Sequence, residues 1–118
     1  MLPRLLRGTC STRSGRNTVG TTMIQRFCFV KLLDDEVDRR GELAEKLRAE
    51  LGAAGADAVV GLPADDSAAR WDMSIVITAA SLDAWNALAR TPAMTGVFDE
   101  LAERAAVVKA WTFSAIDV

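Results

Sequence analysis

Apolar residues in this chain recur first at period two and then at helical spacing, and the order of these segments restricts the fold. Alternating, β-branched and aromatic segments predict strands, while recurrence every three or four residues predicts helices. The order strand, helix, strand, strand, helix, strand predicts an α+β, ferredoxin-like βαββαβ fold, with a four-stranded antiparallel sheet and two helices on one face. The predicted strands are residues 24–33, 56–62, 71–80 and 106–116, and the helical segments are residues 37–54 and 82–105, the second interrupted at Thr91 and Pro92.

The first predicted strand carries apolar side chains on both of its faces. Phe27 and Phe29 point one way, and Cys28 and Val30 point the other. The last predicted strand has the same character, but two helices can cover only one face of the sheet. Because a bare apolar face of several hundred Å² is unusual on a monomer, we expect a second copy of the chain to cover it. The expected assembly is a homodimeric α+β barrel.

The chain has 118 residues and no histidine. Its length fits one domain. The lack of histidine excludes histidine bases, triads that contain histidine and most zinc sites. The two cysteines, Cys10 and Cys28, do not have the spacing of metal ligands. The acidic run from Asp34 to Asp38 fits a helix start better than a cation site, because acidic side chains stabilise a helix N-terminus. We predict no catalytic residue, no metal site and no cofactor.

The charge and hydropathy of the chain argue against two kinds of partner. The formal net charge is −2, whereas proteins that bind the phosphate backbone are usually basic. Trp111 and Phe113 could stack on bases, but the folded part is acidic, so we predict no nucleic-acid partner. No apolar run approaches the roughly 18 residues of a membrane-spanning helix, so we predict no membrane partner.

Residues 1–22 differ in composition from the rest of the chain. They contain four arginines and no acid, giving +4, while residues 23–118 carry −6. Such a segment can bury little apolar surface, so we interpret it as a disordered tail or as an extension upstream of a protein that begins at Met23. The alternative is a transit peptide, which is also Arg-rich, Ser-rich and poor in acids. The expected location is cytoplasmic under the first interpretation and an organelle under the second.

Four short stretches after Met23 stand in the order and spacing of a known family. They are Met23-Ile24 with Phe29-Val30-Lys31-Leu32, Trp71-Asp72 before Ile75-Val76-Ile77, Ser81-Leu82 with Thr91-Pro92-Ala93-Met94 and Phe98, and Val107-Val108 with Trp111 and Phe113. With these stretches, residues 23–118 resemble the stress-responsive α/β-barrel (Dabb) domain of the dimeric α+β barrel superfamily. The resemblance implies one domain with a ferredoxin-like fold and a homodimer.

The resemblance also assigns the two faces of the sheet, which alternation alone leaves open. It turns Arg26, Cys28 and Val30 toward the helices, so that Phe27 and Phe29 face the partner copy. The interface residues that we expect are Phe27, Phe29, Trp111 and Phe113.

This chain departs from the family where the family does its chemistry. Members that act as cyclases use a histidine in the Pro-x-His segment, and the two family histidine positions here hold Thr91 and Met94. The first strand has Arg26 where the family commonly has a histidine. Threonine and methionine cannot act as bases near pH 7. The resemblance therefore implies the fold and the dimer, and leaves catalysis undecided, with a non-catalytic role favoured.

A cleft between the second helical segment and the sheet is the candidate ligand site. Arg26 could anchor an anionic group, or it could extend to water from a strand end. Cys28 could be a reactive thiol beside Arg26, although a buried structural cysteine is the commoner case. The aromatic and aliphatic members could equally be core residues. The candidate pocket residues are Arg26, Cys28, Trp71, Trp85, Met94, Val97 and Phe98.

Three functional hypotheses follow from these residues. The leading one is a non-catalytic or cryptic small-molecule-binding protein of the stress-responsive barrel type, with a small apolar or aromatic ligand. The second is a cofactor-independent, cyclase-like or oxygenase-like enzyme acting on an aromatic or polyketide substrate, which would have to use Arg26, Asp72 or Cys28. The third is a purely structural or interaction role for the dimer.

Overall fold

The predicted order of strands and helices is confirmed in the computed structural model, which describes residues 23–116. The predictions for residues 1–22, including Cys10, lie outside this range. A short 3₁₀ helix, Asp34–Arg39, precedes the first α-helix, and another, Asp66–Ala68, lies between the second and third strands. The main elements are β1 (Ile24–Leu32), α1 (Arg40–Ala53), β2 (Asp57–Gly61), β3 (Met73–Ala79), α2 (Leu82–Ala89), α3 (Pro92–Arg104) and β4 (Ala105–Ser114).

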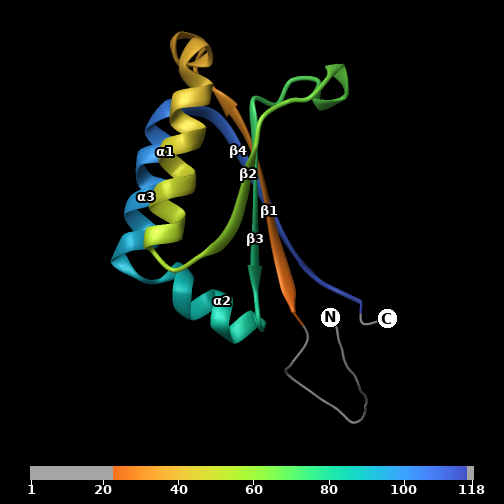
Figure 1. The fold of residues 1–118 in the computed structure, drawn as a ribbon, viewed down its shortest axis with the longest axis vertical. Helices are drawn as coiled ribbons and strands as arrows, with labels where there is room; N and C mark the ends of the chain where they lie inside the picture. Colours follow the sequence, from red (N-terminus) through yellow and green to blue (C-terminus); the bar gives the residue numbers. More distant parts are fainter. Residues whose placement is uncertain (1–22, 117–118) are drawn as a thin grey trace.

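The four strands form one antiparallel sheet in the order β2-β3-β1-β4. Helices α1 and α3 lie side by side on one face of the sheet, and the short α2 lies at one end of it (Figure 1). This is the ferredoxin-like α+β arrangement that the sequence predicts. No α-helix of the described chain covers the opposite face of the sheet, called here the helix-free face, and the connection between β2 and β3, with its 3₁₀ turn, extends toward that side (Figure 1).

The second helical segment is divided into α2 and α3 at the predicted position. The Ser81 hydroxyl accepts a hydrogen bond from the Ala84 N–H at 3.0 Å and caps the start of α2. Thr91 caps α3 in the same way, accepting from the Met94 N–H at 3.3 Å, and Pro92 occupies the first turn. Because proline disfavours helical geometry in the residue before it, α2 ends before Thr91.

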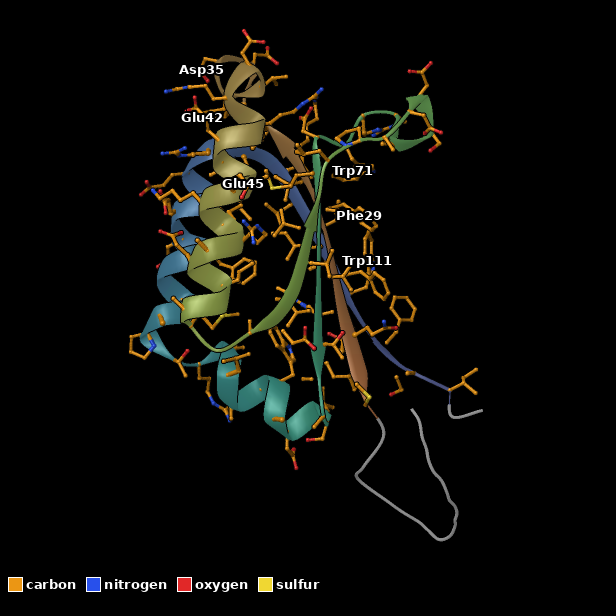
Figure 2. All side chains as sticks on the ribbon, viewed as in Figure 1. Phe29, Asp35, Glu42, Glu45, Trp71 and Trp111 are labelled. Atoms are coloured by element: carbon orange, nitrogen blue, oxygen red, sulfur yellow. The ribbon has the colours of Figure 1, made fainter. Side chains whose placement is uncertain are left out.

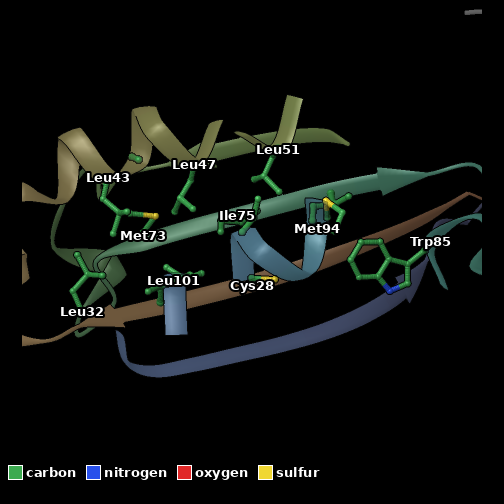
Figure 3. Packing of buried hydrophobic residues seen from close by; sticks show 14 of the residues in the cluster. Cys28, Leu32, Leu43, Leu47, Leu51, Met73, Ile75, Trp85, Met94 and Leu101 are labelled. Atoms are coloured by element: carbon green, nitrogen blue, oxygen red, sulfur yellow. The ribbon is translucent and has the colours of Figure 1, made fainter. Parts of the chain in front are cut away.

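The core lies between the helices and the sheet (Figure 3). Alternate residues of β1 and β3 point into it, including Cys28, Val30 and Ile75, as the period of two requires. Leu47 on α1 and Leu101 on α3 pack against these strands from the helix side. Within residues 23–116, no helix is long and apolar enough to cross a membrane.

Candidate functional site

A pocket of about 310 Å³ lies between the sheet and the pair α2 and α3. Its floor comes from β1 and β4, which pair so that Cys28 lies opposite Ala110. Its walls come from the two helices. The lining residues are Arg26, Cys28, Trp85, Ala89, Met94, Thr95, Phe98, Asp99, Val108 and Ala110.

Helical spacing explains which side chains form the walls. Trp85 and Ala89 are four residues apart on α2 and therefore share a face. On α3, Met94 and Phe98 form one such pair, and Thr95 and Asp99 form the next. Trp85 and Met94 are buried, and Figure 3 shows them at the same end of the core. The pocket is thus a continuation of the core that reaches the surface, since Thr95, Asp99 and Val108 of its lining are exposed.

Arg26 supplies a positive charge at this pocket. Its Nη1 donates a hydrogen bond to the Thr112 hydroxyl at 2.9 Å, and its guanidinium carbon lies 5.7 Å from the centre of the Trp85 ring. Arg26 and Thr112 are also register partners on β1 and β4. None of the carboxylates between residues 23 and 116 forms an ion pair with Arg26. The guanidinium is therefore oriented by a neutral hydroxyl and an aromatic face.

Cys28 is a buried free thiol at the pocket floor. Burial raises the pKa of the Cys28 thiol, and the nearby positive charge of Arg26 offsets this only in part. A thiol held in its neutral form is a poor nucleophile, since the thiolate is the reactive species. At neutral pH Cys28 is therefore an apolar lining group.

Two residues that the sequence assigns to the pocket do not line it. Trp71 lies on the helix-free side, with its ring centre 5.9 Å from that of Phe29 (Figure 2). The sequence predicts a third strand over residues 71–80, which includes Trp71, but β3 begins only at Met73. Before it the chain turns, with Ala69 at a φ of 55° and the Trp71 N–H donating to the Ala68 carbonyl. Strand alternation therefore does not extend to Trp71.

Val97 is the second residue whose predicted place is wrong. It is buried, but it faces a hollow between α1 and α3 that Ala54 and Gly96 also line. Neighbours on a helix are rotated by about 100°. Val97 and Phe98 therefore diverge, Val97 toward α1 and Phe98 toward the pocket.

Sequence reasoning missed five of the lining residues. The helix members could have been found from i, i+4 spacing, because Ala89 lies four residues after Trp85, and Thr95 and Asp99 form the row beside that of Met94 and Phe98. The strand members needed the register of β4 against β1. The missed residues are Ala89, Thr95, Asp99, Val108 and Ala110.

Asp72, the second polar group considered for catalysis, has a structural role. It is buried, one carboxylate oxygen accepts the Leu32 N–H at 2.9 Å, and the other accepts from Arg40 at 3.3 Å. The Asp72 N–H in turn donates to the Val30 carbonyl at 2.8 Å. Asp72 therefore ties the start of β3 to the end of β1. The described part of the chain contains no cluster of three or more histidine, cysteine, aspartate or glutamate side chains suited to a metal ion.

The helix-free face of the sheet carries an apolar row that crosses all four strands. The register places Val59, Val76, Phe27 and Trp111 side by side, from β2 to β4. Phe113 packs edge-on against Phe27, with the ring centres 5.6 Å apart. Much of this row is open: Val59 is 67% exposed, and Trp111 is 46% exposed.

Phe29 adds a second aromatic group to the same face. Its ring centre lies 6.0 Å from that of Trp111, on the other side from Trp71. Figure 2 shows Phe29, Trp71 and Trp111 together on the side of the sheet away from the helices. A depression of about 560 Å³ lies among the aromatic side chains of this face.

The fold and the pocket together define a ferredoxin-like α+β domain with an apolar cleft beneath its second helical segment. Comparison with known sequences adds no family: no protein-family model matches the chain, and no curated protein matches it. Solved structures do match it. A dimeric protein of unknown function with a ferredoxin-like fold, from Bacteroides fragilis, is 19% identical with a TM-score of 0.65, and the match covers 79% of this chain and 96% of that one.

Two further structures show the same likeness. A dimeric ferredoxin-like protein of unknown function from Thermobifida fusca is 17% identical, with a TM-score of 0.62 and coverage of 87% of this chain and 100% of that one. A candidate antibiotic biosynthesis monooxygenase from Caulobacter crescentus is 15% identical, with a TM-score of 0.63 and coverage of 83% and 93%. At these identities the likeness shows the fold, and the fold is ferredoxin-like.

Proposed function

We propose that this chain is a non-catalytic small-molecule-binding protein of the stress-responsive α/β-barrel (Dabb) type, built on one domain over residues 23–118 and acting as a homodimer. Its ligand is small and apolar or aromatic, and it binds in the pocket beneath α2 and α3. One observation carries the proposal: an apolar pocket of about 310 Å³ whose lining includes a single, oriented cation, Arg26. Ligand sites are typically apolar clefts of this kind with a few fixed polar groups.

The chemistry of the pocket supports binding rather than catalysis. Met94, at a position where the resembled family has a histidine, contributes a thioether to the pocket wall. The Thr91 hydroxyl, at the other such position, is engaged twice: it caps α3 and donates to the Leu88 carbonyl at 2.8 Å. Cys28 holds its proton, and Asp72 is committed to the backbone and to Arg40. None of these groups is free to move a proton at neutral pH.

The helix-free face supports the homodimer. An exposed apolar row across four strands, flanked by Phe29 and Phe113, is the kind of surface that soluble proteins bury against a partner. A second copy related by a two-fold axis presents the same row, so the surface is self-complementary. Obligate dimers of this kind bury on the order of 1,500 Å² or more. The dimeric proteins from Bacteroides fragilis and Thermobifida fusca, which have the same fold, agree with this assembly.

A thermal-shift experiment tests the proposed pocket. Small aromatic compounds are screened against the wild type, Thr95→Phe, which fills the pocket, and Ala93→Phe, a matched change on an exposed residue of α3 that does not line it. A compound at about 100 times its Kd adds about 2.7 kcal/mol, which raises the melting temperature of a domain of this size by roughly 10–20 °C. We expect the shift in the wild type and in Ala93→Phe, and its loss in Thr95→Phe. An equal shift in all three proteins, or none in any, would contradict the proposal.

A second candidate function is a cofactor-independent oxygenase-like or cyclase-like enzyme acting on an aromatic or polyketide substrate. The likeness in fold to the candidate monooxygenase from Caulobacter crescentus favours it. Turnover of a pocket ligand that is lost on Arg26→Ala would establish the enzyme. Binding without turnover would support the non-catalytic binding protein. A dimer that binds no ligand would support a structural role.

A further inference from the structure

We propose that the pocket takes a flat aromatic monocarboxylate, with its single anionic group on Arg26 and its ring among Trp85, Met94 and Phe98. This inference rests on the proposed function, because it assigns a ligand class to the same pocket. The supporting observations are the two charged residues of the pocket and the hydrogen bond that orients Arg26.

Within residues 23–116, Arg26 has no charged partner. The guanidinium is half-buried, yet no carboxylate of the described residues pairs with it. A guanidinium has five N–H donors in a planar fork, and the Thr112 hydroxyl accepts from Nη1 alone. The Trp85 ring and Thr112 hold the group in one orientation, which reduces the entropy lost when an anion binds. A carboxylate matches the geometry of the remaining fork better than a spherical anion does.

The rest of the pocket selects the body of the ligand. A volume of about 310 Å³ is at the small end of ligand sites, and suits one or two fused rings. Trp85 and Phe98 offer ring faces and edges, and the Met94 thioether is a favourable neighbour for an aromatic ring. A flat aromatic body therefore fits these walls.

Asp99 limits the ligand to one negative charge. It lines the same pocket on α3, too far from Arg26 to form an ion pair, and it is exposed. A ligand whose first carboxylate binds Arg26 would bring a second one toward Asp99, where like charges repel. Since Asp99 is exposed, solvent and salt weaken both its repulsion of a second carboxylate and its attraction for a cation, so its effect is smaller than that of the half-buried Arg26. The selection is thus against dianions, with monoanions favoured.

Calorimetric titration of the full chain tests this inference with three probes of one shape. These are 2-naphthoate, the neutral 2-naphthamide and naphthalene-2,6-dicarboxylate. A charge-assisted bond to Arg26 predicts that naphthoate binds about tenfold to a hundredfold more tightly than the amide. We expect Arg26→Gln to remove this preference, and Asp99→Asn to improve dicarboxylate binding severalfold. Arg90→Gln is the matched control: it removes a positive charge from an exposed residue that does not line the pocket, and should keep the preference.

If Arg26→Gln fails to fold, Thr112→Val replaces it in the test. This variant removes only the hydroxyl that orients the guanidinium, so we expect it to reduce the preference for naphthoate over naphthamide. Equal affinity of the wild type for naphthoate and naphthamide, with both lost in Thr95→Phe, would overturn the anionic class and leave the pocket as a binding site. No binding of either probe would overturn the proposed pocket, and this inference with it.

Discussion

Phe29→Asp places a charge in the middle of the face that we assign to the dimer interface. The Phe29 ring lies between Trp71, at 5.9 Å, and Trp111, at 6.0 Å, on the helix-free side of β1. The substitution removes both ring contacts within the chain. It also puts a carboxylate where the second copy is proposed to pack. Because of the two-fold axis, each dimer carries the change twice.

The magnitude follows from these contacts. Two aromatic pairs contribute about 1–3 kcal/mol together. Burying the phenylalanine side chain contributes about 1.5–3 kcal/mol more. A buried, unpaired carboxylate then costs several kcal/mol. Domains of this size are stable by roughly 5–15 kcal/mol in total, so we expect Phe29→Asp to unfold the protein rather than to release a stable monomer.

Light scattering with circular dichroism measures the outcome. Ala49→Asp, on an exposed position of α1, is the control for adding a carboxylate, and it should remain a folded dimer. The wild type should have twice the mass of the 12.7 kDa chain. A folded 12.7 kDa monomer, in the wild type or in Phe29→Asp, would refute the interpretation of the helix-free face as an obligate interface.

Three further predictions concern stability. Asp72→Ala leaves the buried Leu32 N–H without its acceptor and should cost about 1–3 kcal/mol in a denaturant titration; an unchanged midpoint would contradict the role given to Asp72. Because burial raises the pKa of the Cys28 thiol, the folded protein keeps a proton that the unfolded chain loses above its ordinary pKa of about 8.5. Stability should therefore be complete below that pH and fall above it, with a slope that Cys28→Ala reduces; the same slope in both proteins would refute this. The chain that begins at Met23 should melt within a degree or two of the full chain; a large drop would show that residues 1–22 pack on the domain.

The fold could be predicted from the sequence because the helix-start residues and the alternation of apolar side chains in the strands indicate the same arrangement. The sequence predicts a break in the second helical segment at Thr91 and Pro92, and α2 and α3 are divided there, with Ser81 and Thr91 as their N-caps. The alternation of Phe27 with Cys28 separates two apolar sets on β1, whatever the rest of the chain does. These signals are local, so they can be recognised without the three-dimensional structure.

The site could be predicted only in part, because its lining depends on where β3 begins and on how β4 is aligned with β1. The sequence predicts Trp71 in the pocket and on the third strand, but β3 starts two residues later, and the turn before Met73 places Trp71 on the helix-free side. Val108 and Ala110 enter the pocket through the register of β4, which no local pattern specifies. The pairing of Arg26 with Thr112 joins residues 86 positions apart. Such long-range placement had to come from the structure.

The most direct test of the binding pocket is a crystal structure of the protein grown with 2-naphthoate. The proposed pocket predicts a naphthalene ring against Trp85, Met94 and Phe98, with the carboxylate within hydrogen-bonding distance of the Arg26 guanidinium. Naphthoate bound only on the helix-free face among Phe27, Phe29 and Trp111, or a pocket filled by rearranged side chains, would contradict it.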